Sequence, residues 1–142
     1  MEARRRTHVE ETGRKLCAAA HTSTAEAAHC DVATVPLSAY VPNRLKKLEP
    51  VRNEMPLVVV LHGLLGNANN WRSMLTRADF LPGFYSVSVD LRNHGKSGWA
   101  PTNSWAEMSN DVLAFAAGFG VHDACLLGHS MGGKVVACRF LQ

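Results

Sequence analysis

The apolar positions of this chain gather into short, nearly unbroken runs. Two of these runs occupy residues 56–61 (PLVVVL) and 124–127 (ACLL), and residues 84–90 (FYSVSVD) form a third strand-like segment. Continuous aliphatic and β-branched runs are typical of strands that a parallel sheet buries on both faces. We therefore predict three strands here, with residues 56–61 as a central strand of the sheet.

Apolar residues at helical spacing lie between the predicted strands. Residues 69–80 predict a first helix, and residues 104–119 predict a second, which begins with the capping-box pair Ser104 and Glu107. We expect these apolar residues to pack in the core: Trp71, Met74 and Leu75 in the first helix, and Trp105, Met108, Val112, Phe115 and Phe119 in the second.

The alternation of strands and helices indicates an α/β fold class. Each strand–helix–strand unit requires parallel strands joined by a right-handed crossover, so we expect a mostly parallel central sheet with flanking helices. Residues 35–40 suggest an earlier strand, and residues 41–55 a loop with or without a second short strand.

A serine stands where the run at 124–127 gives way to a helix. Residues 128–133 read GHSMGG, which fits the G-x-S-x-G pattern of a nucleophile elbow. Such a turn holds its serine at positive φ and leaves no room for side chains two positions away, so Gly128 and Gly132 fit the pattern. We expect Gly133 to let the helix pack closely on the strand. Ser130 is therefore the candidate nucleophile.

Two backbone N–H groups are candidates for an oxyanion hole beside this serine. The N–H of Met131 lies at the start of the helix, where the positive end of the helix dipole favours negative charge. The loop HGLLG at 62–66 follows the central strand and can bring the N–H of Leu64 close to the same point. In enzymes where one such donor has been removed, kcat falls by about 10²–10³-fold.

Together these motifs resemble the α/β-hydrolase superfamily over residues 35–141, and most of all esterases of the alpha/beta-hydrolase domain-containing protein 11 type. The resemblance rests on HGLLG at 62–66, DLRNHGKS at 90–97, MSND at 108–111 and GHSMGGK at 128–134. It implies that Ser130 is the nucleophile of an esterase or thioesterase and that Leu64 and Met131 hold the oxyanion.

The resemblance also implies that the chain is the N-terminal half of the domain. The family's triad runs Ser, then Asp, then His, and a complete member has on the order of 250 residues. Both partners of Ser130 would then follow Gln142, so we expect the fold to be cut after the elbow and the fragment to be inactive by itself. The alternatives are a non-catalytic remnant or truncated gene product, and a C–C bond hydrolase of the same fold.

Other polar residues have a structural and a catalytic interpretation. Asp111 either ties down a neighbouring loop or replaces the missing triad acid. His62, His94 and His129 follow the ends of predicted strands, where open α/β sheets place their sites, and each either braces its own loop or serves as a general base. We favour the structural role for all four.

Composition narrows the remaining possibilities. The net charge of +3 comes from scattered Arg and Lys without interleaved aromatics, which argues against nucleic-acid binding. No apolar run is long enough to span a bilayer, and the cysteines lack metal-ligand spacing. The expected partner is a small acyl ester or thioester, with no cofactor and no metal; no protein partner can be deduced.

The first 34 residues differ from the rest of the chain. They carry the cluster Arg4-Arg5-Arg6 but also four glutamates, and they show no hydrophobic period and no secretory segment. We interpret residues 1–34 as a disordered or targeting extension and residues 35–142 as an incomplete hydrolase domain. The protein is expected to be intracellular, either mitochondrial or cytoplasmic.

Overall fold

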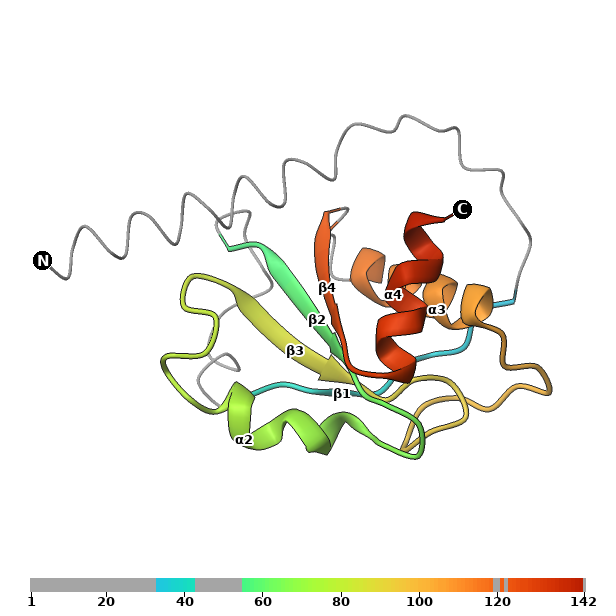
Figure 1. Ribbon diagram of the computed structural model, residues 1–142, viewed down its shortest axis with the longest axis horizontal. Coiled ribbons are helices and arrows are strands. Elements are labelled where there is room, and N and C mark those ends of the chain that lie inside the picture. The colour runs from blue at the N-terminus through green and yellow to red at the C-terminus, as the bar shows by residue number, and fades with distance from the viewer. Residues whose placement is uncertain (1–32, 43–54, 119–120, 122, 142) are drawn as a thin grey trace, which may run out of the picture. The chain divides into compact units, whose positions relative to one another are not determined.

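A four-stranded sheet forms the centre of the fold (Figure 1). The computed structural model describes residues 33–42, 55–118, 121 and 123–141. The strands are β1 (Ala39–Tyr40), β2 (Leu57–Leu61), β3 (Tyr85–Val89) and β4 (Ala124–Gly128), in the order β1-β3-β2-β4. β2 runs parallel to β3 and β4, and β1 pairs antiparallel with β3. The predicted α/β class with a mostly parallel sheet is therefore confirmed.

Helices cover both faces of this sheet. A 3-10 turn, η2 (Ala68–Trp71), and the short α2 (Arg72–Leu75) follow β2, whereas α3 (Trp105–Gly118) precedes β4 and α4 (Met131–Phe140) follows it. Figure 1 shows α3 and α4 together on one face, with α2 on the opposite side. The described part of the chain thus has three layers.

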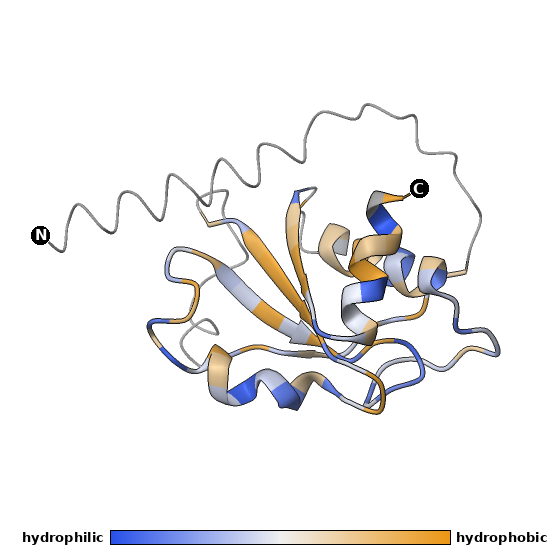
Figure 2. Cartoon of the chain, viewed as in Figure 1, coloured by the Kyte–Doolittle hydropathy of each residue, from blue (hydrophilic) through white to orange (hydrophobic). Residues whose placement is uncertain are grey.

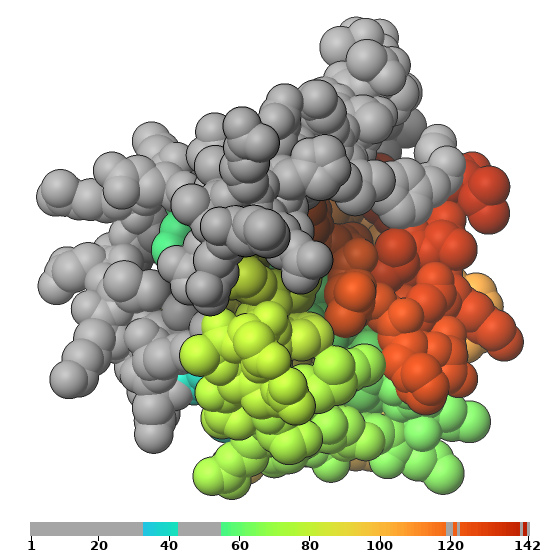
Figure 3. Space-filling view, turned by 60° about the vertical axis from the view of Figure 1, so that its left-hand side comes forward, coloured from blue at the N-terminus to red at the C-terminus, as the bar shows by residue number. Residues whose placement is uncertain are grey.

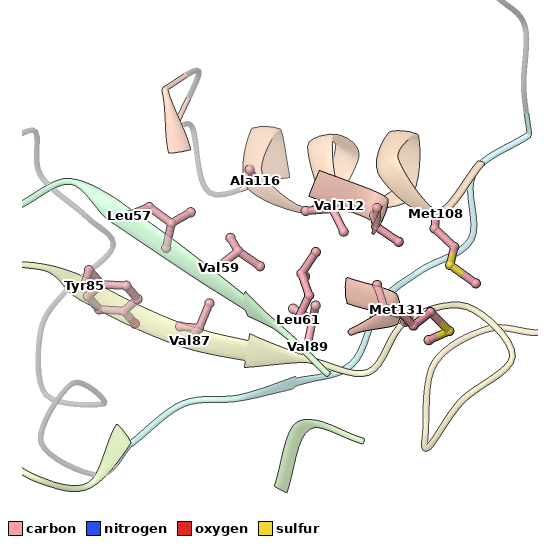
Figure 4. Close-up of a cluster of buried hydrophobic side chains, with 12 residues drawn as sticks. Leu57, Val59, Leu61, Tyr85, Val87, Val89, Met108, Val112, Ala116 and Met131 are labelled. Atoms are coloured by element: carbon pink, nitrogen blue, oxygen red, sulfur yellow. The ribbon is translucent and has the colours of Figure 1, made fainter. Parts of the chain in front are cut away.

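The larger core lies between the sheet and helices α3 and α4. Alternate residues of β2 (Leu57, Val59 and Leu61) point toward this side and are fully buried. Figure 4 shows them facing Met108 and Val112 of α3. Because alternate strand residues point to one face, a single strand contributes three side chains to this layer.

The intervening residues of β2 form the second core. Val58 and Val60 pack on the opposite face with Leu75 of α2. All five residues of β2 are buried, which confirms the predicted central strand, and Figure 2 shows β2 hydrophobic along most of its length. On β3 the same face carries Ser88, whose hydroxyl donates to the Ala68 carbonyl over 2.8 Å.

The first helix is shorter than the predicted 69–80. It begins with a cap at Asn67, whose side chain accepts from the N–H of Asn69, and the helical part ends at Leu75. The Thr76 hydroxyl bonds to carbonyl oxygens of the preceding turn at 3.0 Å. Met74 is 40% exposed, so its predicted core position is wrong.

The second helix agrees more closely with its prediction. Ser104 and Glu107 form the expected capping box, because the Ser104 N–H donates to the Glu107 carboxylate at 2.8 Å and the Ser104 hydroxyl accepts from the Glu107 N–H at 3.3 Å. Trp105 is 42% exposed and lies under the Lys134 ammonium at 5.5 Å, so it is not a core residue. Ala116 is buried instead, and Phe119 lies outside the described residues.

The segment before β1 is held by loops and not by strand pairing. Only Ala39 and Tyr40 pair with β3, so the expected strand at 35–40 is largely wrong. The Gly98 N–H donates to the Pro36 carbonyl over 2.9 Å, and the Ser38 N–H donates to the Ser97 hydroxyl over 2.8 Å.

Several predictions fall on residues that the structure does not describe. They concern nearly all of the extension at 1–34 and most of the segment at 41–55. Among the residues that are described, no helix combines the length and the apolar character needed to cross a bilayer.

Candidate active site

Ser130 occupies the turn between β4 and α4 in a conformation that side chains rarely adopt. Its backbone angles are φ 54° and ψ −111°, and the residue is exposed. The positive φ expected from the sequence is therefore observed. Non-glycine residues in such regions carry strain of about 1–3 kcal/mol, which the surrounding structure must sustain.

Two glycines allow this turn to close. A Cβ on Gly128 would lie 2.5 Å from the nitrogen of Gly133 and closer still to the carbonyl of Gly132. A Cβ on Gly132 would lie 2.7 Å from the Cβ of Leu61 in β2. A Cβ on Gly133 would lie 3.4 Å from the Gly128 oxygen and 3.8 Å from the Gly128 carbonyl carbon, which are ordinary contacts. The close approach of strand and helix therefore requires Gly128 and Gly132, and the expectation for Gly133 is not met.

A second turn lies directly against Ser130. Residues 63–66 close a tight turn in which the Gly66 N–H donates to the Gly63 carbonyl over 3.0 Å, with Leu65 at φ 58°. A Cβ on Gly63 would be 3.3 Å from the Cβ of Ser130. The two turns meet because β2 and β4 are parallel neighbours whose carboxyl ends share one edge. Figure 3 shows green atoms from the loop after β2 beside red atoms of α4.

Backbone bonds fix the two turns to each other. The His129 N–H donates to the Leu61 carbonyl at 3.2 Å, and the Gly132 N–H donates to the His62 carbonyl at 3.1 Å. Within the described part of the chain, neither the N–H of Leu64 nor that of Met131 donates a hydrogen bond.

His62 is a buried brace between two loops. The Leu91 N–H donates to its Nε2 over 3.0 Å, and its Nδ1 lies 2.7 Å from the Gly63 carbonyl oxygen. Since Nε2 accepts, the proton must be on Nδ1, which donates to Gly63. Burial is the main cause that lowers the pKa of His62 below its usual value, and nearby His94 lowers it further. With both ring nitrogens occupied, His62 cannot serve as the base for Ser130.

The other two histidines at this edge also contact neighbouring loops. His94 Nδ1 lies 2.8 Å from the Arg92 carbonyl, and its ring centre is 5.0 Å from that of His62. His129 packs edge-on against Trp71 at 6.4 Å. In the residues that the structure describes, none of the three hydrogen-bonds to the Ser130 hydroxyl, and no group of three or more metal-binding side chains gathers.

Asp90 organises the site, although sequence reasoning did not single it out. Its carboxylate accepts from the N–H of Ala68 at 2.6 Å and from the N–H of Lys96 at 2.8 Å. A Cβ on Gly95 would overlap this carboxylate. The side chain therefore ties the loop after β2 to the loop after β3. Its position at the end of a buried strand was the available sequence clue.

Asp111 has the structural role that the sequence favoured. It binds Arg92 in a bidentate pair at 2.6 and 2.9 Å, with both side chains fully buried, and accepts from the Val35 N–H at 2.9 Å. Arg92 also contacts Glu107 at 3.1 Å. Hydrogen bonds from Thr102 and then Ser104 lower the pKa of Glu107 to about 2. Asp111 is thus a loop anchor and not a replacement for a triad acid.

Comparison with known proteins identifies the fold family. A family model described as alpha/beta hydrolase fold matches residues 56–142. The chain is 38% identical over 88 residues to the sn-1-specific diacylglycerol lipase ABHD11 of Mus musculus, covering 62% of this chain and 29% of that protein. It is 33% identical over 90 residues to the 2-succinyl-6-hydroxy-2,4-cyclohexadiene-1-carboxylate synthase of Serratia proteamaculans, covering 63% and 34%.

A solved structure agrees with these sequence relatives. A marine microorganism esterase superposes with a TM-score of 0.59 and 27% identity, covering 72% of this chain and 35% of the esterase. The chain thus spans about a third or less of the length of each of these proteins. With the match at residues 56–142, the chain belongs to the alpha/beta hydrolase fold family.

Proposed function

We propose that the protein hydrolyses small carboxylic esters or thioesters, with Ser130 as its nucleophile. The observation that carries this proposal is the backbone of Ser130, an exposed residue held at φ 54° between β4 and α4. A strained, exposed serine at the carboxyl edge of a parallel sheet fits a nucleophile. The esterase and lipase among the similar proteins support the same class of substrate.

The proposed chemistry is acyl transfer through the serine oxygen. Ser130 Oγ attacks the substrate carbonyl while a general base takes its proton, and the carbonyl oxygen becomes an oxyanion. The N–H groups of Leu64 and Met131 stabilise that oxyanion, the alcohol or thiol leaves, and water then releases the acyl group from Ser130. The described histidines brace loops or pack against aromatic rings, so we assign the base and its acidic partner to residues outside the described part.

The experiment that tests this proposal is labelling of the full-length protein with a fluorophosphonate probe. We expect wild type to be labelled and to hydrolyse p-nitrophenyl esters, and Ser130→Ala to lose both properties. Ser73→Ala is a matched control, because Ser73 is an exposed serine on α2 away from this turn. Its labelling and turnover should equal those of wild type.

Two results would contradict the proposal. Labelling that persists in Ser130→Ala places the reactive group elsewhere. A folded wild-type protein with neither labelling nor turnover supports the non-catalytic alternative. Cleavage of a 1,3-diketone without ester hydrolysis would instead favour a C–C bond hydrolase.

A further inference from the structure

The peptide unit between Gly63 and Leu64 is held from its oxygen side. The Gly63 carbonyl oxygen accepts two hydrogen bonds, from His62 Nδ1 at 2.7 Å and from the Gly66 N–H at 3.0 Å. No cis peptide bond occurs among the described residues. In a planar trans peptide the N–H points opposite to the carbonyl, so bonds that fix the Gly63 oxygen also fix the direction of the Leu64 N–H.

His62 is itself held in place by burial and by a hydrogen bond from the Leu91 N–H. The residue is 1% exposed, and the Leu91 N–H, 3.0 Å from Nε2, determines which ring nitrogen carries the proton. Gly66 leaves little room for movement, because a Cβ there would lie 3.2 Å from His62 Nδ1 and 2.9 Å from the Gly63 oxygen. The imidazole therefore links the end of β3 to the turn at 63–66.

We propose that His62 is a positioning residue that aims the Leu64 N–H at the reaction centre of Ser130. Its Nδ1–H bond to the Gly63 carbonyl orients one donor of the oxyanion hole, and the Leu91 N–H holds the imidazole in the tautomer that makes this bond. The inference rests on the proposed function of Ser130. It assigns His62 a role in the rate of the reaction without contact to the substrate.

The same arrangement makes the orientation sensitive to acid. A protonated imidazole donates from both nitrogens, so its Nε2 can no longer accept from the Leu91 N–H. The titratable groups around His62 are His94, at 5.0 Å between ring centres, and Asp90 at the end of β3. His129 lies close to Gly63, where an added Cβ would be 3.1 Å from its Nδ1. Burial lowers the pKa of His62 below 6.5. The neutral, aligned form is therefore present at neutral pH and is lost as pH falls through the lowered pKa.

A pair of variants separates positioning from bracing. His62→Asn keeps an amide donor at the position of Nδ1, so it retains the bond to Gly63 and loses the acceptor for Leu91. His62→Gln places its amide at the outer position, so its oxygen accepts from Leu91 and the donor to Gly63 is lost. Each variant forfeits one of the two bonds, so we expect similar losses in thermal stability.

The two variants should nevertheless differ in catalysis in the full-length protein. We expect kcat of His62→Gln to fall about 10²-fold with little change in KM, the loss typical of one oxyanion donor. We expect kcat of His62→Asn to stay within about tenfold of wild type. Equal losses of kcat in both variants, or losses confined to KM, would mean that His62 only stabilises the fold.

A second measurement leaves His62 unchanged and needs no catalytic turnover. In NMR spectra with labelled histidine and Leu64 amide nitrogen, the Leu64 amide shift should follow the titration of His62. In His94→Asn, the removal of a repelling neighbour should move that shared midpoint to higher pH. A Leu64 amide that ignores the His62 titration would overturn the inference. The NMR titration needs no catalytic turnover, so its outcome can be told apart from a failure of the Ser130 labelling test.

Discussion

At the scale of single residues, the turn at Ser130 can close because Gly128 has no side chain. In Gly128→Ala, the added methyl group would meet the backbone of Gly132 and Gly133, which cannot rotate away as the end of a side chain can. We expect a loss of unfolding free energy at or above the upper end of the range of about 1–3 kcal/mol for overpacking. Urea denaturation of the full-length protein measures it.

Gly118 provides the matched control for this substitution. A Cβ at Gly118, the last residue of α3, would meet no atom within 4 Å. Replacing a helical glycine with alanine commonly stabilises by about 0.5–1 kcal/mol. Equal stability of Gly128→Ala and Gly118→Ala would show that the β4–α4 turn is looser than its geometry indicates.

The sequence revealed Ser130 and its glycines because their requirements are local. The spacing of Gly128, Ser130 and Gly132 within a strand–turn–helix pattern indicates the turn without knowledge of the rest of the fold. Asp90 could not be assigned in that way, because its partners at Ala68 and Lys96 belong to two different loops. Only the folded sheet brings those N–H groups together.

At the scale of elements, a buried ion pair joins the loop after β3 to α3. Asp111→Asn leaves the fully buried Arg92 guanidinium without its bidentate partner. Removing one partner of a buried pair typically costs about 3–5 kcal/mol. We expect a loss of this size in the free energy of unfolding, measured in urea.

The exposed pair of Arg77 and Asp79 is the control for this loss. It has a similar distance of 2.7 Å, but its side chains are 65% and 69% exposed. Asp79→Asn should therefore change stability by no more than about 1 kcal/mol. Equal effects of the two substitutions would show that burial does not strengthen the Arg92–Asp111 pair.

The strands could be predicted from their apolar runs, but the bounds of the first helix depend on capping residues that such runs do not reveal. Burial on both faces leaves β2 with an unbroken apolar run that is visible in the sequence. The helix after β2 instead begins where Asn67 caps it and has ended by Thr76, whose hydroxyl bonds to backbone carbonyls. Apolar spacing continues to Phe80 because that residue packs on the core from a turn.

At the scale of the whole described fold, stability should follow position in the sheet. β2 is paired on both sides and covered on both faces, whereas β1 consists of two residues paired on one side. In hydrogen exchange at neutral pH, we expect the amides of β2 to be the slowest and those of Ala39 and Tyr40 among the fastest strand amides. Equal protection of β1 and β2 would contradict this order.

The hydrogen bond between Val35 and Asp111 can form only some time after Val35 has been synthesised, because Asp111 is added to the chain later. Its partners are 76 positions apart in the chain. Ribosomes add about 5–20 residues per second, so the 76 positions correspond to about 4–15 s of translation. During that interval the segment beside Val35 exists without its anchor. A chaperone that binds nascent chains therefore has seconds in which to reach this segment before Asp111 can bind it.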